Sequence, residues 1–379
     1  MTISTWSFPT KIAFGAGAAA TVAAECERLG LSRVLLVTDR GVVAAGLAAP
    51  VENSLKRAAV KVAVFDGISS NPTEAEIEAG AEAFRSADAE GLVALGGGSP
   101  LDAAKLVAVR ARTDRSWEEL DDAAGGGQFV PAVLPPVIAL PTTSGTGSEV
   151  GRAAVLTVAS SGRKTVVFHP SMLPRVAILD PELTKTMPAS VTAATGFDAL
   201  THCAEAYMAR GDHPMADAIA VAGVDLVAKH LPRALEEPAD LDARGGMMKA
   251  AMMGAVAFQK GLGACHSLAH PLSSEHGLHH GLANALCLPA VIEFNEAEVL
   301  ERVLHLSLLL GGDAEPGAAA ARLRGLRQQW GLPGSLRAAG VADPDLDRLT
   351  ALAMEDACHR DNPRPVSAQD MRALYQACI

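Results

Sequence analysis

The chain has 379 residues, of which 49% are apolar and 20% are charged, a composition that supports a large core and argues against disorder. At roughly 150 residues per domain, this length predicts two domains, with three as the alternative. Acidic residues outnumber basic ones by 43 to 32, and the net charge of −11 argues against nucleic acid or anionic lipid as a partner. We therefore expect a small-molecule partner, with no nucleic acid and no membrane.

The lack of a recognisable secretory or membrane signal and the pattern of cysteines favour a cytoplasmic protein. Residues 1–10 lack the basic and apolar regions of a secretory signal. The longest apolar runs, such as Val130–Leu140, are broken by prolines and fall short of the roughly 18 residues of a membrane helix. The six cysteines are scattered without a CxxC pair, which favours reduced, mostly buried thiols over a zinc finger or a disulfide scaffold.

In the first half of the chain, short β-branched runs alternate with Ala-rich amphipathic stretches. The runs predicted to form strands are Arg33–Asp39, Val60–Phe65, Gly91–Leu95 and Val137–Leu140. The stretches predicted to form helices between them are Gly41–Ala58 and Thr73–Ala87. This alternation is typical of parallel βαβ units, so we predict a doubly wound parallel sheet.

From about Pro188 the strand signals disappear and long helical stretches take their place. The predicted helices are Ser190–Ala209, Pro214–His230, Asp242–Lys260, His280–Phe294 and Glu296–Leu310, followed by a helical tail from Gly317. Two prolines bracket the connection at residues 180–188. We therefore predict an α/β domain over residues 1–184 and an all-helical domain over residues 185–379.

Two turns rich in small residues follow predicted strands. Gly96–Pro100 opens a helix, where glycine lets a ligand approach the backbone and free N–H groups favour an anion such as pyrophosphate. Pro141–Glu149 presents several hydroxyls together. Doubly wound sheets bind nucleotides at the carboxyl ends of their strands, so we predict a nucleotide site here. Neither turn is a GxGxxG fingerprint or a P-loop, and a tight turn with a capping serine is the alternative for the first.

Two polar residues follow other predicted strands. A carboxylate at Asp39 can accept hydrogen bonds from an adenosine ribose and would repel a 2′-phosphate, so it predicts NAD rather than NADP. The alternative role of Asp39 is to cap the next helix. Asn71 precedes a proline at another connection, where turn formation is the first interpretation and ligand contact the second.

Five of the eleven histidines fall within fifteen positions of one another, and they are His266, His270, His276, His279 and His280. Asp198 and His202 are four residues apart in a predicted helix, as are His266 and His270, so each pair points to one face. Such pairs commonly build divalent metal sites for iron, zinc, cobalt or nickel. Spacing alone does not choose among the five histidines. The sequence has no HExxH or GxSxG motif for protease or hydrolase chemistry.

These motifs together resemble the iron-containing (group III) alcohol dehydrogenases over nearly the whole chain. The segments that carry the resemblance are Phe8–Gly17, Gly96–Lys105, Thr142–Glu149, Asp180–Thr184, Gly196–His202 and Gly261–Pro271. Their occurrence in this order is highly specific. Two positions depart from the family pattern. Gly151 stands where the family commonly has threonine, and Leu278-His279-His280-Gly281 stands where it often has Pro-His-Gly.

The resemblance implies a metal-dependent, NAD(H)-linked alcohol dehydrogenase or aldehyde reductase that acts on a small alcohol or aldehyde, often as a homodimer. It also implies the dehydroquinate synthase-like architecture of this family, with residues 1–184 as the dinucleotide-binding domain and residues 185–379 as the metal-binding and substrate domain. The metal that the resemblance favours is Fe(II), with Zn(II) as the alternative. The implied metal ligands are Asp198, His202, His266 and His280, with His270 beside the metal as a catalytic non-ligand. The implied cofactor contacts are Asp39, Asn71, Gly97, Gly98, Ser99, Asp102, Thr142, Thr143, Thr146, Lys164 and Leu183.

The expected reaction is hydride transfer between a carbinol carbon and the nicotinamide C4, with His270 relaying the hydroxyl proton. His276 and His279 would then lie on the approach to the metal, where they bind an anionic substrate group or are simply solvated. The alternatives are a maleylacetate reductase-type enzyme and, less favoured, a dehydroquinate synthase-like lyase with a Glu-and-two-His metal site. A non-catalytic binding protein with a decayed site is a third, against which the complete ligand set argues.

Overall fold

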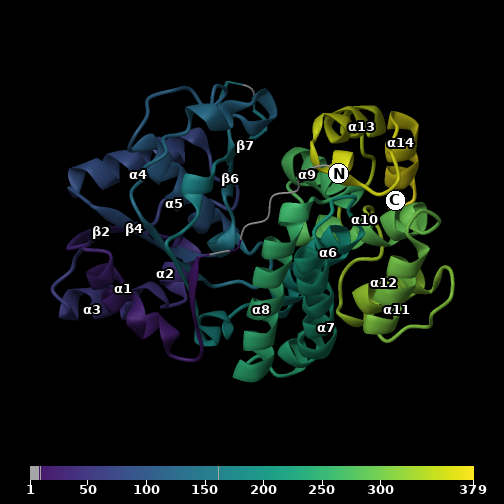
Figure 1. The fold of residues 1–379 in the computed structure, drawn as a ribbon, viewed down its shortest axis with the longest axis horizontal. Helices are drawn as coiled ribbons and strands as arrows, with labels where there is room; N and C mark the ends of the chain where they lie inside the picture. The colour runs from purple at the N-terminus through teal and green to yellow at the C-terminus, as the bar shows by residue number, and fades with distance from the viewer. Residues whose placement is uncertain (1–7, 9, 161) are drawn as a thin grey trace. The chain divides into compact units, whose positions relative to one another are not determined.

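The computed structural model describes residues 8, 10–160 and 162–379, which form two compact units (Figure 1). The α/β unit comprises Phe8–Thr143 and Gly147–Thr186, and the helical unit comprises Ser144–Thr146 and Met187–Ile379. The absence of a secretory signal was expected for residues 1–10, most of which lie outside the described residues. Within the described part of the chain, no helix combines the length and apolar character needed to cross a bilayer.

The α/β unit contains a six-stranded sheet with the strand order β1-β8-β5-β4-β2-β3. These strands are β1 (Lys11–Phe14), β2 (Arg33–Val37), β3 (Lys61–Phe65), β4 (Gly91–Gly96), β5 (Val137–Pro141) and β8 (Val176–Leu179). Each pair of neighbours in the sheet runs parallel. The predicted doubly wound parallel sheet is therefore confirmed, with the four predicted strands as β2 to β5.

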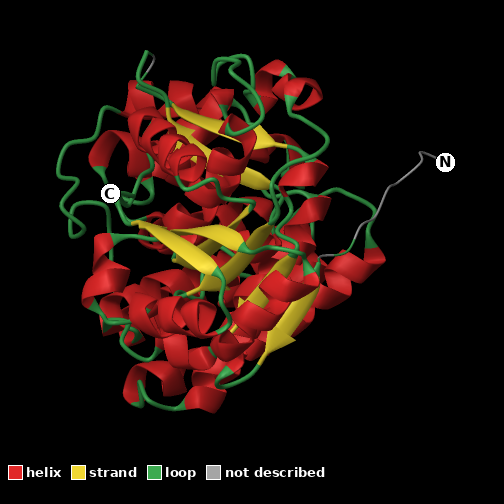
Figure 2. Ribbon diagram, turned by 90° about the vertical axis from the view of Figure 1, so that its left-hand side faces the viewer, coloured by secondary structure: helices red, strands yellow, loops and turns green. Residues whose placement is uncertain are grey.

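Helices supply an apolar layer for each face of this sheet (Figure 2). The helices of the α/β unit are α1 (Val22–Arg28), α2 (Arg40–Ala44), α3 (Ala48–Arg57), α4 (Glu74–Ser86) and α5 (Gly98–Arg110). Leu35 and Val37 of β2 share a core with residues of α4 and α5. The intervening Val34 and Leu36 share another core with residues of α1 and α3. Alternate side chains of a strand point to opposite faces, so a strand covered on both sides reads as one continuous apolar run.

The α/β unit differs from the sequence prediction in several places, and its strands β1 and β8 were not predicted. The helix expected over Gly41–Ala58 is broken into α2 and α3, because Gly46 adopts a left-handed backbone conformation with φ of 76° between them. An antiparallel hairpin of β6 (Ala153–Thr157) and β7 (Lys164–Phe168) was not predicted. It follows the hydroxyl-rich turn directly, so it lies close to the predicted cofactor residues in the chain.

Residues 187–379 form helices and loops, which confirms the predicted all-helical C-terminal part. The helices are α6 (Ala189–Met208), α7 (Pro214–Glu236), α8 (Leu241–Ala257), α9 (Ala264–His276), α10 (His280–Asn295), α11 (Leu300–Leu309), α12 (Ala318–Gln329), α13 (Leu346–Glu355) and α14 (Ala368–Gln376). Helix α6 packs against α7, α8 and α10. Helices α6, α7 and α8 run side by side in Figure 1. Sixteen of its residues are buried, beginning at Thr192, so this helix forms the centre of the unit.

Candidate functional site

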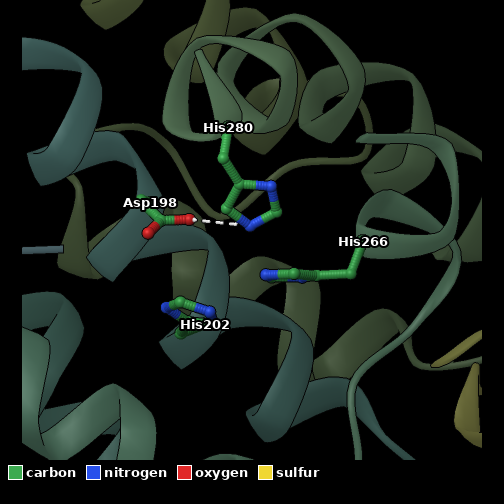
Figure 3. Close-up of side chains that lie close together, drawn as sticks. All are labelled: Asp198, His202, His266 and His280. Carbon is green, nitrogen blue, oxygen red and sulfur yellow. Dashed lines mark ion pairs between the residues drawn. The ribbon is translucent and has the colours of Figure 1, made fainter. Parts of the chain in front are cut away.

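Four side chains that the sequence singled out converge in the helical unit (Figure 3). Asp198 and His202 project from α6, His266 comes from the first turn of α9, and His280 is the first residue of α10. One potential ligand atom from each lies within 4.8 Å of the others. Oδ1 of Asp198 lies 3.5 Å from Nε2 of His280, and the rings of His202 and His266 stack with centroids 4.6 Å apart.

Burial and mutual proximity set the charges of this cluster. Burial alone would raise the pKa of Asp198, but the surrounding imidazoles and a hydrogen bond from Asn284 lower it to about 2. Burial lowers the pKa of His202 to about 4 and that of His280 well below its usual value. At neutral pH the cluster therefore presents an ionised carboxylate beside two neutral imidazoles.

His266 is held by a buried carboxylate on the other side of its ring. Its Nδ1 lies 2.5 Å from Oε2 of Glu205, and both side chains are almost completely buried. Oε1 of Glu205 accepts a further hydrogen bond of 2.7 Å from the backbone N–H of Cys265. Burial tends to lower the pKa of His266, but Glu205 raises it. A carboxylate on Nδ1 leaves Nε2 to face the cluster, as in carboxylate–histidine–metal arrangements.

The donor set fits a divalent transition metal. One carboxylate and three imidazoles are ligands that iron and zinc accept. Within the described residues, the buried Nδ1 of His202 has no hydrogen-bond partner, which is unusual for a buried polar atom. The amide of Asn284 donates a hydrogen bond of 2.8 Å to Oδ1 of Asp198 and so orients the carboxylate. The residues present are therefore suited to the metal that the sequence predicts.

Two glycines let the backbone approach this cluster closely. A Cβ atom at Gly281, the second residue of α10, would lie 2.1 Å from the backbone oxygen of Ala194 and 3.1 Å from Cβ of Asp198. A Cβ atom at Gly145 would lie 2.9 Å from Cβ of Thr195 and 3.2 Å from Oδ2 of Asp198. Real Cβ atoms essentially never come within 3.0 Å of another heavy atom, so a larger residue at either position would displace the chain around the ligands.

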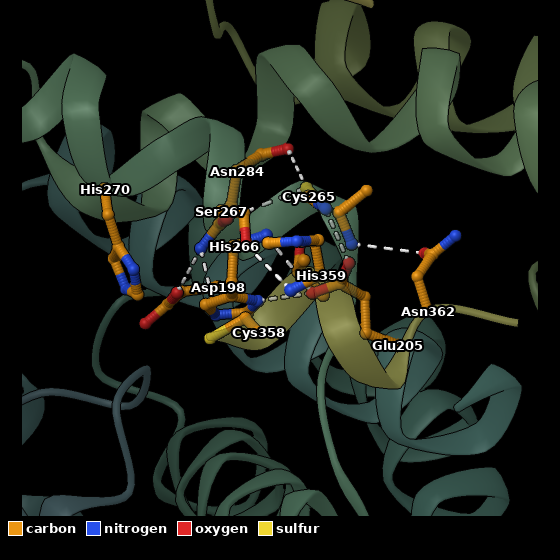
Figure 4. A network of polar contacts seen from close by, with 12 residues as sticks. Asp198, Glu205, Cys265, His266, Ser267, His270, Asn284, Cys358, His359 and Asn362 are labelled. Atoms are coloured by element: carbon orange, nitrogen blue, oxygen red, sulfur yellow. Dashed lines mark hydrogen bonds and ion pairs between the residues drawn. The ribbon is translucent and has the colours of Figure 1, made fainter. Parts of the chain in front are cut away.

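His270 lies beside the four-residue cluster and belongs to a second polar group (Figure 4). Its ring stacks on that of His280 with centroids 5.2 Å apart and meets that of His266 edge-on at 5.9 Å. Its Nδ1 lies 2.7 Å from Oδ2 of Asp356. His276, the last residue of α9, and His279, just before α10, are exposed and do not join the cluster.

The first predicted cofactor turn and the beginning of the second lie together in the α/β unit, whereas Ser144–Thr146 of the second turn belong to the helical unit. Gly97 caps α5 and Gly98 begins it, while the backbone N–H of Thr142 donates a 2.8 Å hydrogen bond to the oxygen of Gly96. A Cβ atom at Gly97 would lie 3.2 Å from Cγ2 of Thr143. The start of α5 and the beginning of the hydroxyl-rich turn are therefore adjacent, at the carboxyl ends of the paired strands β4 and β5.

The other predicted cofactor residues occupy different environments. Asp39 caps α2, because its Oδ1 accepts a 2.9 Å hydrogen bond from the backbone N–H of Val42. Ser99 donates a 2.8 Å hydrogen bond to the backbone oxygen of Ser70, next to the exposed Asn71. Leu183 is packed into the core that includes β8. Lys164 begins β7, and Thr146 belongs to the helical unit.

Asp102 sits in a buried polar group that joins α5 to the second turn and to β6. Its Oδ1 accepts a 2.5 Å hydrogen bond from Ser148, and its Oδ2 accepts one of 3.0 Å from the backbone N–H of Val155. The ammonium of Lys105 donates to Ser148 Oγ at 2.7 Å and to the backbone oxygen of Ala153 at 2.8 Å. Both oxygens of Asp102 are thus engaged by the protein. Asp102 therefore holds the second turn and β6 against α5.

Sequence reasoning missed the carboxylates that hold the imidazoles. Glu205 could have been found, because it follows His202 by three residues on α6 and shares its helix face. Asp356 carried no such signal, because it lies 86 residues from His270 in the chain. Lys105 and Ser148 were within the quoted motifs, but only the fold pairs them.

Comparison with known proteins places both units in one family. Residues 9–181 match the family described as iron-containing alcohol dehydrogenase, and residues 192–379 match the C-terminal region of the same family. The chain belongs to the iron-containing alcohol dehydrogenase family. Members of this family therefore provide the relevant comparisons for the metal cluster and the cofactor turns.

Several members of the iron-containing alcohol dehydrogenase family resemble the chain over its full length. A protein of Cupriavidus necator named 4-hydroxybutyrate dehydrogenase is 42% identical, and the match covers 97% of each chain. A solved 1,3-propanediol oxidoreductase has a TM-score of 0.95 at 33% identity, with 100% of both chains covered. A sulfoacetaldehyde reductase from Bifidobacterium kashiwanohense, solved with NAD+, has a TM-score of 0.90 at 31% identity, covering 100% of this chain and 99% of that one.

Proposed function

We propose that this protein is an NAD(H)-linked alcohol dehydrogenase and aldehyde reductase that acts on a small alcohol or aldehyde with one divalent metal. The favoured metal is Fe(II), and Zn(II) is the alternative. The observation that carries the proposal is the buried cluster of Asp198, His202, His266 and His280. Family membership supports metal-dependent oxidation of alcohols and reduction of aldehydes.

In this proposal the four clustered residues hold the metal. Asp198 is ionised and His202 and His280 are neutral at pH 7, which are the protonation states that metal binding requires. Glu205 keeps the proton of His266 on Nδ1 and frees Nε2 as a ligand. A divalent metal bound there supplies a Lewis acid, which favours loss of the hydroxyl proton of an alcohol.

The cofactor turns provide a place for NAD(H). Gly97 caps α5, and Gly98 and Ser99 are its first two residues. The backbone N–H groups at the start of a helix lack partners within the helix, and together with the helix dipole they favour a pyrophosphate. Asp39 can accept hydrogen bonds from the adenosine ribose while it caps α2. NAD supplies the hydride acceptor. The structure of the related sulfoacetaldehyde reductase with NAD+ supports this choice of cofactor.

His270 is the proposed proton carrier. Its Nδ1 is engaged by Asp356, so Nε2 is the nitrogen that can accept a proton. In the oxidative direction the alcohol loses a hydride to the nicotinamide and its hydroxyl proton to His270, and a carbonyl compound remains. In the reductive direction both are returned to the aldehyde, so one site serves both reactions.

Two of the compared proteins are named for substrates that carry an acidic group, namely 4-hydroxybutyrate and sulfoacetaldehyde. We therefore include acidic as well as neutral alcohols among the candidate substrates. The exposed imidazoles of His276 and His279 are the groups proposed to distinguish the two kinds. If their double alanine variant handles acidic and neutral alcohols with unchanged relative efficiency, that assignment is wrong.

The decisive assay follows NADH absorbance. Protein loaded separately with Fe(II) or Zn(II) is mixed with NAD+ and a panel that includes 4-hydroxybutyrate and 1,3-propanediol. We expect alcohol-dependent NADH formation that is lost when the metal is removed and in His266→Ala, whose metal content should fall in parallel. A parallel reaction with NADH and maleylacetate tests the related reductase activity. Absence of nicotinamide turnover with every alcohol and aldehyde would contradict the proposal.

We further propose a homo-oligomer, most simply a homodimer, in the cytoplasm. Strand β1 lies at one edge of the six-stranded sheet, and the large apolar side chain of Phe14 in this strand is exposed. An apolar sheet edge is a surface that a second copy can cover. All six cysteines are free, which suits a reducing compartment. Light scattering on the purified protein measures the oligomeric state.

A further inference from the structure

We propose that Asp356 is a positioning residue for His270, and that its carboxylate fixes the ring tautomer through which His270 takes up the substrate proton. This inference rests on the function proposed above, because it assigns His270 a role in that reaction. Asp356 follows the last residue of α13 and lies far from the metal-cluster residues in sequence. Its contact with His270 therefore joins the end of α13 to α9.

The short contact between the two side chains defines the tautomer. Oδ2 of Asp356 lies 2.7 Å from Nδ1 of His270. An ionised carboxylate can only accept hydrogen bonds, so Nδ1 must carry the ring proton. In the neutral ring, Nε2 then carries a lone pair, which is the state required to accept a proton from a hydroxyl group.

Asp356 is itself held in place by two other donors. Its Oδ1 accepts hydrogen bonds from Ser267 Oγ at 2.7 Å and from the backbone N–H of Cys358 at 2.8 Å. Burial would raise the pKa of Asp356, but attraction to His270 and these hydrogen bonds bring it well below its usual value. The carboxylate therefore stays ionised, and each of its oxygens has a distinct set of partners.

Helix α9 uses the same arrangement at two neighbouring imidazoles. His266 meets Glu205 through Nδ1 at 2.5 Å, and His270, one turn later, meets Asp356 through Nδ1 at 2.7 Å. The two rings lie edge to face with centroids 5.9 Å apart. One carboxylate serves an imidazole inside the four-residue cluster, and the other serves an imidazole beside it.

The alternative is a second metal site formed by His270, Asp356 and Cys358, whose potential ligand atoms lie within 4.8 Å of one another. Both oxygens of Asp356 already accept hydrogen bonds. Burial also raises the pKa of the Cys358 thiol well above its usual value, and a protonated thiol is a poor ligand. The geometry therefore favours a hydrogen-bonded pair over a second metal site.

The substitution Asp356→Asn tests this arrangement sharply. Ser267 Oγ and the Cys358 N–H both donate to the Oδ1 position, so the carbonyl oxygen of an asparagine is held there. Its NH2 group must then face Nδ1 of His270 and donate to it. Nδ1 becomes the acceptor, the ring proton moves to Nε2, and His270 can no longer accept a proton from the substrate.

Nitrogen NMR of histidine-labelled, zinc-loaded protein reads the tautomer directly, with the His270 signals assigned by their loss in His270→Ala. We expect the Nδ1–H form in the wild type and the Nε2–H form in Asp356→Asn. Ser267→Ala is the matched control, because it removes one donor to Asp356 but leaves the Oδ2 contact, and it should keep the Nδ1–H form. The metal content should be the same in all three proteins, at one ion per chain.

Kinetics then connect the tautomer to the reaction. We expect kcat of Asp356→Asn to fall by about a hundredfold with little change in KM, since general acid–base catalysis contributes at least this much. An Nε2–H tautomer in the wild-type protein would overturn the proposal even if the variant fails to fold. So would an inverted tautomer with unchanged kcat, or a second metal ion that Asp356→Asn removes. Absence of alcohol oxidation in the wild type would instead refute the proposed function and leave the NMR result standing.

Discussion

Gly281→Ala should disrupt the metal cluster without removing any ligand. The new Cβ atom would start 2.1 Å from the backbone oxygen of Ala194, whereas ordinary contacts begin at 3.4 Å, so the two helices must separate by about 1.3 Å. Neither backbone segment is a flexible side chain that can turn away. His280 precedes Gly281 directly, so it moves with the first turn of α10. Metal–ligand distances tolerate only about 0.2 Å, so His280 should no longer bind together with Asp198.

We expect metal affinity to fall by about a hundredfold in Gly281→Ala, and the metal-free protein to lose roughly 1–3 kcal/mol of stability through overpacking. Metal titration and urea unfolding of the metal-free protein measure the two effects. Gly325→Ala is the matched control, because this glycine lies in α12 with no atom within 4 Å of a new Cβ. It should retain metal and gain about 0.5–1 kcal/mol from helix propensity. Wild-type metal affinity in Gly281→Ala would refute the reasoning.

Three further substitutions probe other contacts. Glu205→Gln should weaken metal binding by about ten- to a hundredfold, because His266 loses its carboxylate partner, and unchanged metal affinity would show that the contact is incidental. The wild type should prefer NAD(H) over NADP(H) by about a hundredfold, because the 2′-phosphate would meet the carboxylate of Asp39. Asp39→Gly should narrow this gap in kcat/KM with little loss of stability, since glycine is a tolerated helix cap. A wild-type preference for NADP(H) would contradict that role. Lys105→Met should cost about 3–5 kcal/mol in urea unfolding, because it removes a fully buried ammonium group from beside the partly buried carboxylate of Asp102. A loss of less than about 1 kcal/mol would show that the fold does not depend on this pair.

The parts of the fold that the sequence predicted are those with strong periodicity. The short β-branched runs of β2 to β5 and the long helices of the C-terminal half were recognisable for this reason. Strand β8 was missed because its four apolar residues are too few to distinguish a strand from a loop. Six residues separate β6 from β7, which is longer than the two-residue turns that mark a hairpin most clearly, and the pairing of the two strands becomes visible only in the structure.

The candidate site divides in the same way. Asp198 and His202 lie four residues apart on one helix, so spacing alone pointed to a metal site. The choice of His266 and His280 from five nearby histidines came from family resemblance, because the deciding contacts are between helices. Asp356 was beyond the reach of sequence patterns, since the loop that brings it to His270 has no periodic relation to α9.

The helical unit is not a single stretch of chain, because Ser144–Thr146 belongs to it while the residues on either side belong to the α/β unit. This has a consequence for recombination. A chimera of two relatives joined between residues 186 and 187 would inherit position 145 from one parent and Thr195 and Asp198 from the other. Only a glycine at position 145 fits against these two residues. A gene fragment that begins at Met187 would also encode the ligand-bearing helices without Ser144–Thr146. Chimeras and fragments of the helical unit should therefore keep Ser144–Thr146 from the same parent.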